Sequence, residues 1–370
     1  MLKFNKTYFL LTAFIALLLA GCTRHIALNK IFVTYPPPPD TARIQYLTSF
    51  SSSLDIEGKR SALQEIVLGD DEALSIGKPY GIATTRGKIF ICDTSIGGIE
   101  ILNLDKKTFT LFAPVGKGKL KQPINCFVDQ AGSLYITDVG RKEVVVFDNN
   151  LNYVTAIGKL DTLDDFKPLD VTVSETKIWI TNPKVNKIFV YQKDSFKLID
   201  SFPDAVQGED KFLANPINIF YRNNKVYVTD FGDFKVKVFT DDGKYLRSVG
   251  QYGKSLGHFV RPKGIAVDHN DNLFVVDAGF ENIQMFNDKG KLLMFFGGPY
   301  KNHGDLWLPA KVLIDYENLQ HFKKWVDPEY DLNYLIYVTN QYGPDKISVF
   351  GAIKPKIKSL KIGGTGSSRK

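Results

Sequence analysis

The stretch PKGIAVDHNDNLFVVDAGFENIQMFNDKGKLLMFFG, residues 262–297, decides the fold of this chain. It contains four short runs rich in β-branched and aromatic residues, separated by Asn, Asp and Gly, which is typical of strands joined by tight turns. The predicted strands are Gly264–Asp268, Leu273–Val276, Ile283–Phe286 and Lys291–Phe295. The segment is therefore expected to form one four-stranded antiparallel sheet.

The same pattern recurs along the chain, and each copy opens with a proline. The prolines are Pro79, Pro123, Pro168, Pro216, Pro262 and Pro309, at steps of 44, 45, 48, 46 and 47 residues. The second apolar run of each copy closes with Asp93, Asp138, Asn182, Asp230, Asp277 or Asn340. Because these Asp and Asn residues recur in every copy, we interpret them as architectural acceptors of backbone N–H bonds. A four-stranded unit with this period is a propeller blade, so we predict an all-β, six-bladed β-propeller.

The sixth copy lacks a fourth strand of its own. It ends with the predicted strand Lys346–Phe350, and the orphan run Arg43–Phe50 resembles the fourth strands of other copies, such as Tyr245–Val249. An open ring would expose strand edges at its two ends. We therefore expect an N-terminal strand to complete the last blade, so that the propeller occupies residues 43–350.

The blades resemble NHL repeats, in which a proline precedes a Gly-Ile-Ala-Val-Asp run, a Tyr-Val-x-Asp run and a Val-Phe ending. The resemblance extends from Pro79 to Phe350. The stretches YPPPPDTARIQYLTSF and YVTNQYGPDKISVFG also resemble a group of bacterial lipoproteins with six NHL-type blades. NHL propellers include enzymes, protein-binding scaffolds and RNA binders, so this resemblance implies a fold and not one function.

The amino-terminal residues indicate export. Lys3 and Lys6 precede an apolar run that ends at Leu19-Ala20-Gly21-Cys22, which is the layout of a secretory signal. The run is too short for a stable membrane-spanning helix. Its ending resembles the lipobox of bacterial lipoproteins, which implies a signal peptide over residues 1–21 and lipid attached to Cys22.

The mature chain is accordingly expected to be an exported lipoprotein, held at the membrane by its lipid and without a transmembrane span. Thr23 follows the cysteine, and by analogy with enteric bacteria this favours the outer membrane. Residues 22–42 are expected to form a tether that includes a stiff polyproline segment.

Most of the net positive charge lies at the carboxyl end. The whole chain carries a net charge of +7, and residues 351–370 carry six cations and no acid. The body therefore shows no basic patch for nucleic acid, and no nucleic-acid partner is expected. We expect residues 351–370 to be a disordered tail. A basic arm that touches anionic glycans, lipid headgroups or an acidic partner is the alternative.

The residues that flank the opening prolines are the best candidates for a functional rim. In propellers of this type the strand after the proline is innermost, and the loop into it lines one mouth of the central channel. The rim residues are Lys78, Tyr80, Gln122, Asn125, Lys167, Asp170, Asn215, Asn218, Arg261, Lys263 and Lys311. This collar suits an anionic or sugar-like ligand or a partner's acidic loop. The alternative is a set of solvated residues around a water-filled channel.

The positions of the histidines decide whether the chain could hold a catalytic metal ion. Amidating lyases and metal-dependent lactonases of similar architecture need metal ligands that converge in the channel. His258 and His303 are the candidate pair, and two imidazoles without a third ligand make a poor zinc site. No catalytic residue or cofactor is assigned, and a calcium site built from oxygen ligands stays open. A channel-site hydrolase or lyase is thus the alternative to a binding role.

The sixth copy carries an insertion at about residues 317–334. Leu319, Phe322, Trp325 and Val326 fall at helical spacing, which indicates a short amphipathic helix. Phe322 and Trp325 could anchor a protein partner. Alternatively, the segment folds back onto the underside of the propeller.

Two cysteines remain after the lipidated one. Cys92 and Cys126 can form a disulfide or be two small buried side chains, and the second interpretation is favoured. Taken together, the sequence predicts a lipid-anchored envelope propeller that serves as a protein-binding or assembly scaffold, with an envelope protein as its partner.

Overall fold

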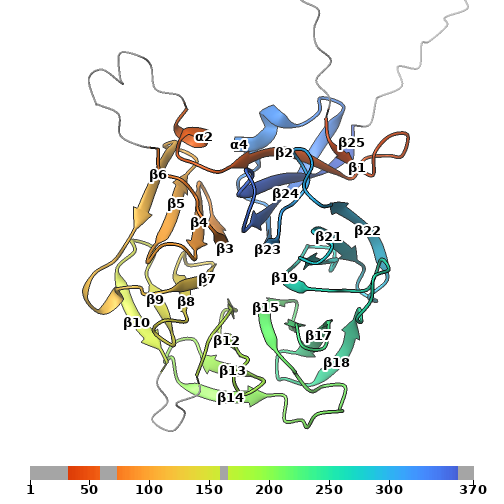
Figure 1. Ribbon diagram of the computed structural model, residues 1–370. Coiled ribbons are helices and arrows are strands. Elements are labelled where there is room, and N and C mark those ends of the chain that lie inside the picture. The colour runs from red at the N-terminus through yellow and green to blue at the C-terminus, as the bar shows by residue number, and fades with distance from the viewer. Residues whose placement is uncertain (1–31, 59–72, 159–165, 357–370) are drawn as a thin grey trace, which may run out of the picture. The chain divides into compact units, whose positions relative to one another are not determined.

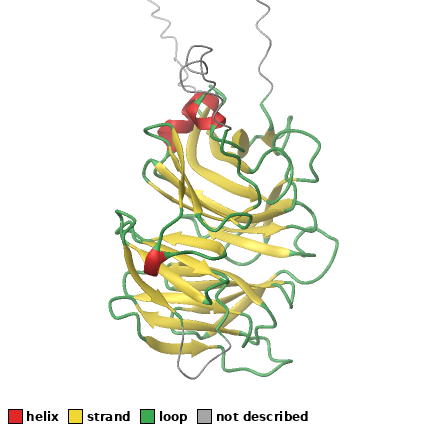
Figure 2. Cartoon of the chain, turned by 60° about the vertical axis from the view of Figure 1, so that its left-hand side comes forward, coloured by secondary structure: helices red, strands yellow, loops and turns green. Residues whose placement is uncertain are grey.

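The computed structural model describes residues 32–58, 73–158 and 166–356. These residues form six antiparallel sheets, arranged as the blades of a propeller around a central axis (Figure 1). Strands dominate the structure, and only a few short helical turns interrupt the loops (Figure 2). The predicted all-β, six-bladed propeller is confirmed. Within the described residues no helix is long and apolar enough to cross a membrane.

Each of the first five blades is made from consecutive strands. Blade one comprises β3 (Pro79–Thr85), β4 (Lys88–Asp93), β5 (Ile99–Asn103) and β6 (Thr108–Phe112). Blade two comprises β7 (Pro123–Val128), β8 (Leu134–Asp138), β9 (Glu143–Phe147) and β10 (Tyr153–Ile157). Blade three comprises β11 (Val171–Val173), β12 (Lys177–Asn182), β13 (Lys187–Gln192) and β14 (Leu198–Phe202). A 3-10 turn, η1 (Gly116–Gly118), precedes blade two.

The next two blades follow the same order. Blade four comprises β15 (Pro216–Arg222), β16 (Lys225–Asp230), β17 (Lys235–Thr240) and β18 (Tyr245–Val249). Blade five comprises β19 (Pro262–Val267), β20 (Leu273–Asp277), β21 (Asn282–Phe286) and β22 (Leu292–Gly297). Blade five is the segment that opened the sequence argument, and its strands lie within two residues of the predicted bounds.

Blade six combines both ends of the propeller. It comprises β23 (Pro309–Asp315), β24 (Tyr330–Asn340), β25 (Ile347–Pro355), β2 (Ile44–Phe50) and β1 (Thr34–Tyr35). The strand β2 pairs with β25 in antiparallel register, with Tyr46 opposite Phe350 and Phe50 opposite Ile347. The predicted closure of the ring by an N-terminal strand is therefore confirmed.

The apolar core is divided among the seams between neighbouring blades. The seam between blades six and one contains Phe50 of β2, Ile82 of β3 and Tyr337 of β24, all buried. Equivalent clusters occupy the other five seams in the described part of the chain. The closing seam is thus packed like the others, because β-branched and aromatic side chains cover both faces of each sheet.

The end of the expected tether belongs to the propeller instead. Thr34 and Tyr35 form β1, which pairs with β2, and the Arg43 N–H donates to the Tyr35 carbonyl at 2.9 Å. The Tyr35 ring packs 6.1 Å from Phe296 and 6.3 Å from Phe350. The chain therefore turns back after Tyr35. Packing this ring against Phe296 and Phe350 favours the turn over an extended polyproline conformation. The tether prediction was wrong here, and residues 22–31, with Cys22, lie outside the described residues.

The first residues of the expected tail also belong to the sheet. β25 continues to Pro355, and Ala352 and Ile353 are buried. The predicted tail is therefore corrected over residues 351–355, since these apolar side chains pack in blade six. Residues 357–370 lie outside the described residues.

Candidate functional site

The Asp and Asn residues at the ends of the second strands accept hydrogen bonds from the backbone just before each blade begins. Asp93 accepts the backbone N–H of Lys78 at 2.9 Å, and Asp277 accepts that of Arg261 at 2.9 Å. Asp138, Asn182, Asp230 and Asn340 make the corresponding bonds in the other blades. The predicted architectural role of these residues is confirmed, because each carboxylate or amide satisfies N–H groups just before a blade begins.

Threonines that precede these residues tie neighbouring blades together. Thr137 donates to the Leu169 carbonyl of the next blade at 3.1 Å, and Thr229 donates to that of Lys263 at 2.7 Å. Thr339 donates to the Tyr80 carbonyl at 2.8 Å and so joins blade six to blade one. The repeated Thr-Asp and Thr-Asn pairs were the signal in the sequence for these ties, and the sequence argument missed it.

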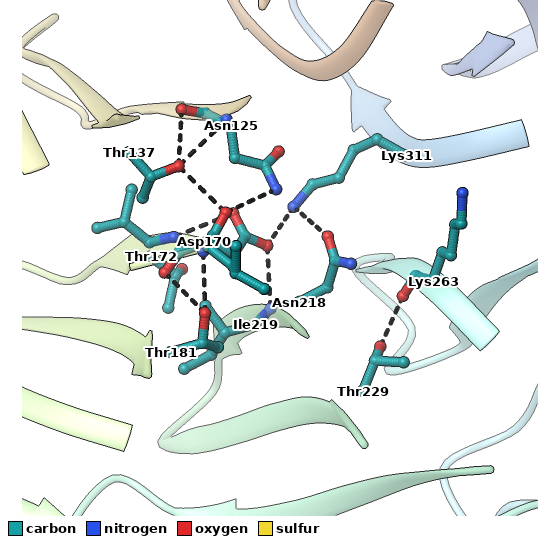
Figure 3. A network of polar contacts seen from close by, with 12 residues as sticks. Asn125, Thr137, Asp170, Thr172, Thr181, Asn218, Ile219, Thr229, Lys263 and Lys311 are labelled. Carbon is teal, nitrogen blue, oxygen red and sulfur yellow. Dashed lines mark hydrogen bonds and ion pairs between the residues drawn. The ribbon is translucent and has the colours of Figure 1, made fainter. Parts of the chain in front are cut away.

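An ion pair crosses the axis of the propeller (Figure 3). Lys311 lies on β23 of blade six, and Asp170 directly precedes β11 of blade three, so the two come from opposite sides of the ring. The Lys311 Nζ contacts Asp170 Oδ2 and lies 3.2 Å from Asn218 Oδ1. The side chains of Lys311 and Asp170 are 8% and 0% exposed. We call Lys311, Asp170 and Asn218 the axis bridge.

The charges of the axis bridge are paired with each other and hydrogen-bonded within the protein. Asp170 also accepts the backbone N–H groups of Val171 and Ile219, each at 3.0 Å. Burial raises the pKa of Asp170, while the Lys311 ammonium and these N–H groups oppose the rise. Buried charges persist only when they are paired and hydrogen-bonded in this way. The axis bridge is therefore built as a structural element.

The structure divides the predicted rim into two groups. Asn125, Asp170, Asn218 and Lys311 are buried in the channel and contact one another or the backbone. The expectation that these four face a ligand at an open rim is corrected by their burial. The remaining rim residues lie at the upper mouth, the end of the channel where the innermost strands begin: Lys78, Tyr80, Gln122, Lys167, Asn215, Arg261 and Lys263.

Three cations gather at the upper mouth. The Lys263 Nζ donates to Gln341 Oε1 at 3.1 Å and lies 5.6 Å from the centre of the Tyr80 ring. Burial, with the positive charges of Arg261 and Lys78, lowers the pKa of Lys263 to about 8. None of these three cations forms an ion pair with a carboxylate of the described residues. The upper mouth is therefore a place of uncompensated positive charge.

Aromatic side chains border these cations. The Lys78 Nζ lies 5.4 Å from the centre of the Tyr342 ring. Tyr342 is 48% exposed and Trp307 is 46% exposed, and the Tyr342 N–H reaches the Trp307 carbonyl at 3.5 Å. The sequence argument missed Tyr342 and Trp307 because both lie outside the repeated positions, in the loops around blade six. Large exposed aromatic side chains of this kind are common at binding surfaces.

The two candidate histidines are held by different neighbours. His258 Nε2 lies 3.0 Å from Gln251 Nε2, whereas His303 Nδ1 lies 2.9 Å from Asp345 Oδ2. His303 also stacks on Tyr46, with 6.2 Å between ring centres. In the part of the chain that the structure describes, no group of three or more His, Cys, Asp or Glu side chains is placed to hold a metal ion.

The blade-six insertion folds onto the propeller. It forms the short helix α4 (Leu319–Phe322) and the 3-10 turn η2 (Lys323–Trp325) before β24 begins. Phe322 is 1% exposed and packs 5.9 Å from Tyr337. The Gln45 amide donates to the Trp325 carbonyl at 2.8 Å. Phe322 is therefore a core residue and not a partner anchor, because its ring fills the seam between blades six and one.

The two cysteines are free and buried. Cys92 lies on β4 and Cys126 on β7 of the adjacent blade, and Cys126 Sγ lies 3.8 Å from the Phe90 carbonyl. Burial and the neighbouring Cys126 raise the pKa of the Cys92 thiol well above its ordinary value. Both residues pack in the apolar seam between blades one and two, as expected of small hydrophobic side chains.

Comparisons with known proteins agree with this architecture. Residues 205–360 match the model of the family DUF5128, described as a 6-bladed beta-propeller. No curated protein matches the sequence significantly.

Several solved structures are similar to the chain. A structural genomics protein from Bacteroides thetaiotaomicron has a TM-score of 0.57 at 14% identity, over 84% of this chain and 76% of that one. A gluconolactonase from Xanthomonas campestris has a TM-score of 0.53 at 14% identity, over 84% and 98% of the two chains. A streptogramin B lyase has a TM-score of 0.51 at 15% identity, over 83% and 87%. At these identities the likeness concerns the fold alone, and the chain itself is a six-bladed β-propeller.

Proposed function

We propose that this chain is a lipid-anchored, NHL-type binding propeller of the bacterial envelope, whose upper mouth engages an acidic segment of another envelope protein. The observation that carries the proposal is the group formed by Lys78, Arg261 and Lys263, which lacks carboxylate partners among the described residues. Cations that are close together and uncompensated favour an anionic partner.

The surroundings of these cations support a protein partner. Tyr342 and Trp307 offer exposed aromatic surface beside Lys78, and aromatic anchors next to charges are typical of protein–protein contact sites. The two charges deeper in the channel, Lys311 and Asp170, are already paired with each other in the axis bridge. Binding at the mouth therefore fits this molecule better than chemistry inside the channel.

The export and anchoring part of the proposal is supported by the amino-terminal apolar run and the Leu19-Ala20-Gly21-Cys22 motif that follows it. We expect Cys22→Ser to move the protein from the membrane fraction to the soluble fraction of lysed cells. Retention of this variant in an outer-membrane fraction would contradict the proposed lipid anchor, and the upper mouth can then still be tested separately.

The upper mouth is tested with a photo-cross-linking amino acid placed at Tyr342 in intact cells, followed by mass spectrometry of the cross-linked peptide. We expect a peptide rich in Asp and Glu, and the double variant Arg261→Met, Lys263→Met should lose the cross-link. Lys289→Met, an exposed cation in the β21–β22 turn, is the matched control and should retain it. A peptide without acidic residues, or a cross-link unaffected by the double variant, would refute the proposal.

The pH dependence adds a second measurement. Because the pKa of Lys263 is lowered to about 8, this side chain loses its charge as the pH rises from 7 to 9. Binding of the acidic peptide should weaken over that range, and it should weaken less in Lys263→Met, as measured by fluorescence titration with the identified peptide.

A further inference from the structure

The lower mouth, the end of the channel where the innermost strands finish, is hollowed into a broad bowl. A cavity of about 800 Å³ is lined by residues of blades one, two, four, five and six. A second cavity of about 730 Å³ is lined by residues of blades two, three and four. Both cavities are bordered by residues 128–131 and by Arg222, so they form one continuous bowl. Each of the two cavities by itself has a volume in the range of sites for small molecules.

Arg222 is the one side chain of blade four that lines both halves of the bowl. Its guanidinium has no hydrogen bond or ion pair within the described residues, and its Nε is buried without a partner. A buried donor that is left unpaired costs free energy. The geometry therefore points to a ligand that supplies the missing acceptor.

Several carboxylates that line the bowl are already engaged by other groups of the protein. Asp129 pairs with Lys193 at 2.8 Å, and Asp315 accepts from the Asn318 amide at 2.6 Å and from the Tyr337 hydroxyl at 3.3 Å. These two carboxylates are thus already engaged. Asp241 of the second cavity pairs with Lys177 at 3.3 Å. Two further cations that line the bowl, Arg86 and Lys88, form no ion pair within the described residues, and Glu175 and Glu317 are the remaining acids.

The wall beside Arg222 presents a flat aromatic pair. His269 stacks on Tyr316 with 3.6 Å between ring centres and 8° between planes. Burial and the charge of Arg222 lower the pKa of His269, so the imidazole is neutral at pH 7 and adds no charge. The side chains of Gln130 and Asn149, which also line the cavity, can hydrogen-bond to hydroxyl groups.

We propose that the lower mouth is a binding site for a small sugar that carries a carboxylate or phosphate group, with the anionic group on Arg222. The planar fork of a guanidinium matches both kinds of group with two parallel hydrogen bonds. The sugar ring lies against the His269–Tyr316 pair, within reach of the amides. This site is separated from the upper mouth by the axis bridge and does not depend on the function proposed there.

The proposal is tested by isothermal titration calorimetry of the purified mature propeller with glucuronate, glucose 6-phosphate and glucose. We expect at least one anionic sugar to bind at least tenfold more tightly than glucose, and the stronger of the two identifies carboxylate or phosphate as the group recognised. Arg222→Gln should weaken that binding by about tenfold or more. Arg222→Lys should recover part of it, since it keeps the charge but not the fork.

A matched control is Arg247→Gln on the outer strand β18, where the guanidinium donates to the Asp288 carbonyl. This variant should bind the anionic sugar like the unmodified protein, and thermal melting checks that all variants are folded. Equal binding of glucose and both anions, no binding of either anion, or unchanged binding in Arg222→Gln would each overturn the proposal.

Discussion

Lys311 and Lys263 occupy almost the same place in two neighbouring blades, yet only Lys311 has a carboxylate partner in the described residues. Lys311 is the second residue after its proline and Lys263 is the first. Side chains alternate along a strand, so a shift of one residue changes the direction in which a side chain points. Lys311 crosses the axis to Asp170, whereas Lys263 stays at the upper mouth without a carboxylate partner in the described residues.

The difference shows how one repeat can supply both structure and a binding surface. A lysine that meets a carboxylate across the axis stays buried and charged. A lysine that is largely buried beside other cations has a lowered pKa and is left for an external partner. The three predictions that follow test this contrast between side chains that are packed or paired within the protein and side chains that are not.

The largest effect is expected from breaking the axis bridge. Lys311→Met leaves the Asp170 carboxylate buried without its cation, and removal of one partner of a buried ion pair costs about 3–5 kcal/mol. We expect the free energy of unfolding, measured in urea, to fall by that amount. The double variant Lys311→Met, Asp170→Leu removes both charges and should recover most of the loss. If the single variant unfolds at the midpoint of the unmodified protein, the bridge is not structural.

An effect of similar size is expected in the blade-six insertion. Phe322→Ala removes a ring that is 1% exposed, and such truncations cost about 3–5 kcal/mol. Thermal melting should show a clear drop in Tm. Leu256→Ala, at a side chain that is 55% exposed, is the control and should leave Tm nearly unchanged. An unchanged Tm in Phe322→Ala would restore the idea of a partner anchor.

The smallest effect on stability is expected at one position of the third strand, which is occupied by different residues in blades one and five. Glu100 of blade one is 3% exposed, and burial with the nearby Asp93 raises its pKa to about 9. Blade five has Gln284 at the equivalent position, where it donates to the His258 carbonyl at 2.9 Å. A neutral side chain is thus sufficient at this position.

The raised pKa of Glu100 sets the sign of its pH dependence. Its folded-state pKa lies above its unfolded value, so its contribution to stability is complete below about pH 4.5 and is lost as the pH rises toward 9. Glu100→Gln should remove this loss and stabilise the protein by roughly 2–3 kcal/mol at pH 7. Urea unfolding at pH 5, 7 and 8.5 measures the slope. A slope that is the same in both proteins would show that Glu100 does not carry it.

Local signals were sufficient for the blades. Apolar alternation, Asn, Asp and Gly in the turns, and the proline at each entrance act within a few residues of one another. For the same reason the strand that completes blade six was recognisable in Arg43–Phe50. The role of Asp93 and its equivalents also followed from repetition alone, since each bonds to the backbone of its own blade.

The polar site was not predictable in the same way. Asp170 and Lys311 are 141 residues apart, and no spacing in the chain states that blades three and six face each other at one depth. Nor did the helical spacing of the insertion show that Phe322 points into the seam.

The number of blades, the order of their strands and the closing strand thus follow from the amino-acid sequence alone, because short-range patterns and turns encode them. The three-dimensional fold decides which side chains meet across the axis, which cations keep no carboxylate partner in the described residues, and where Arg222 lies in the lower bowl. Those outcomes depend on distances between residues far apart in the chain, and the burial and charge of each group depend in turn on those distances.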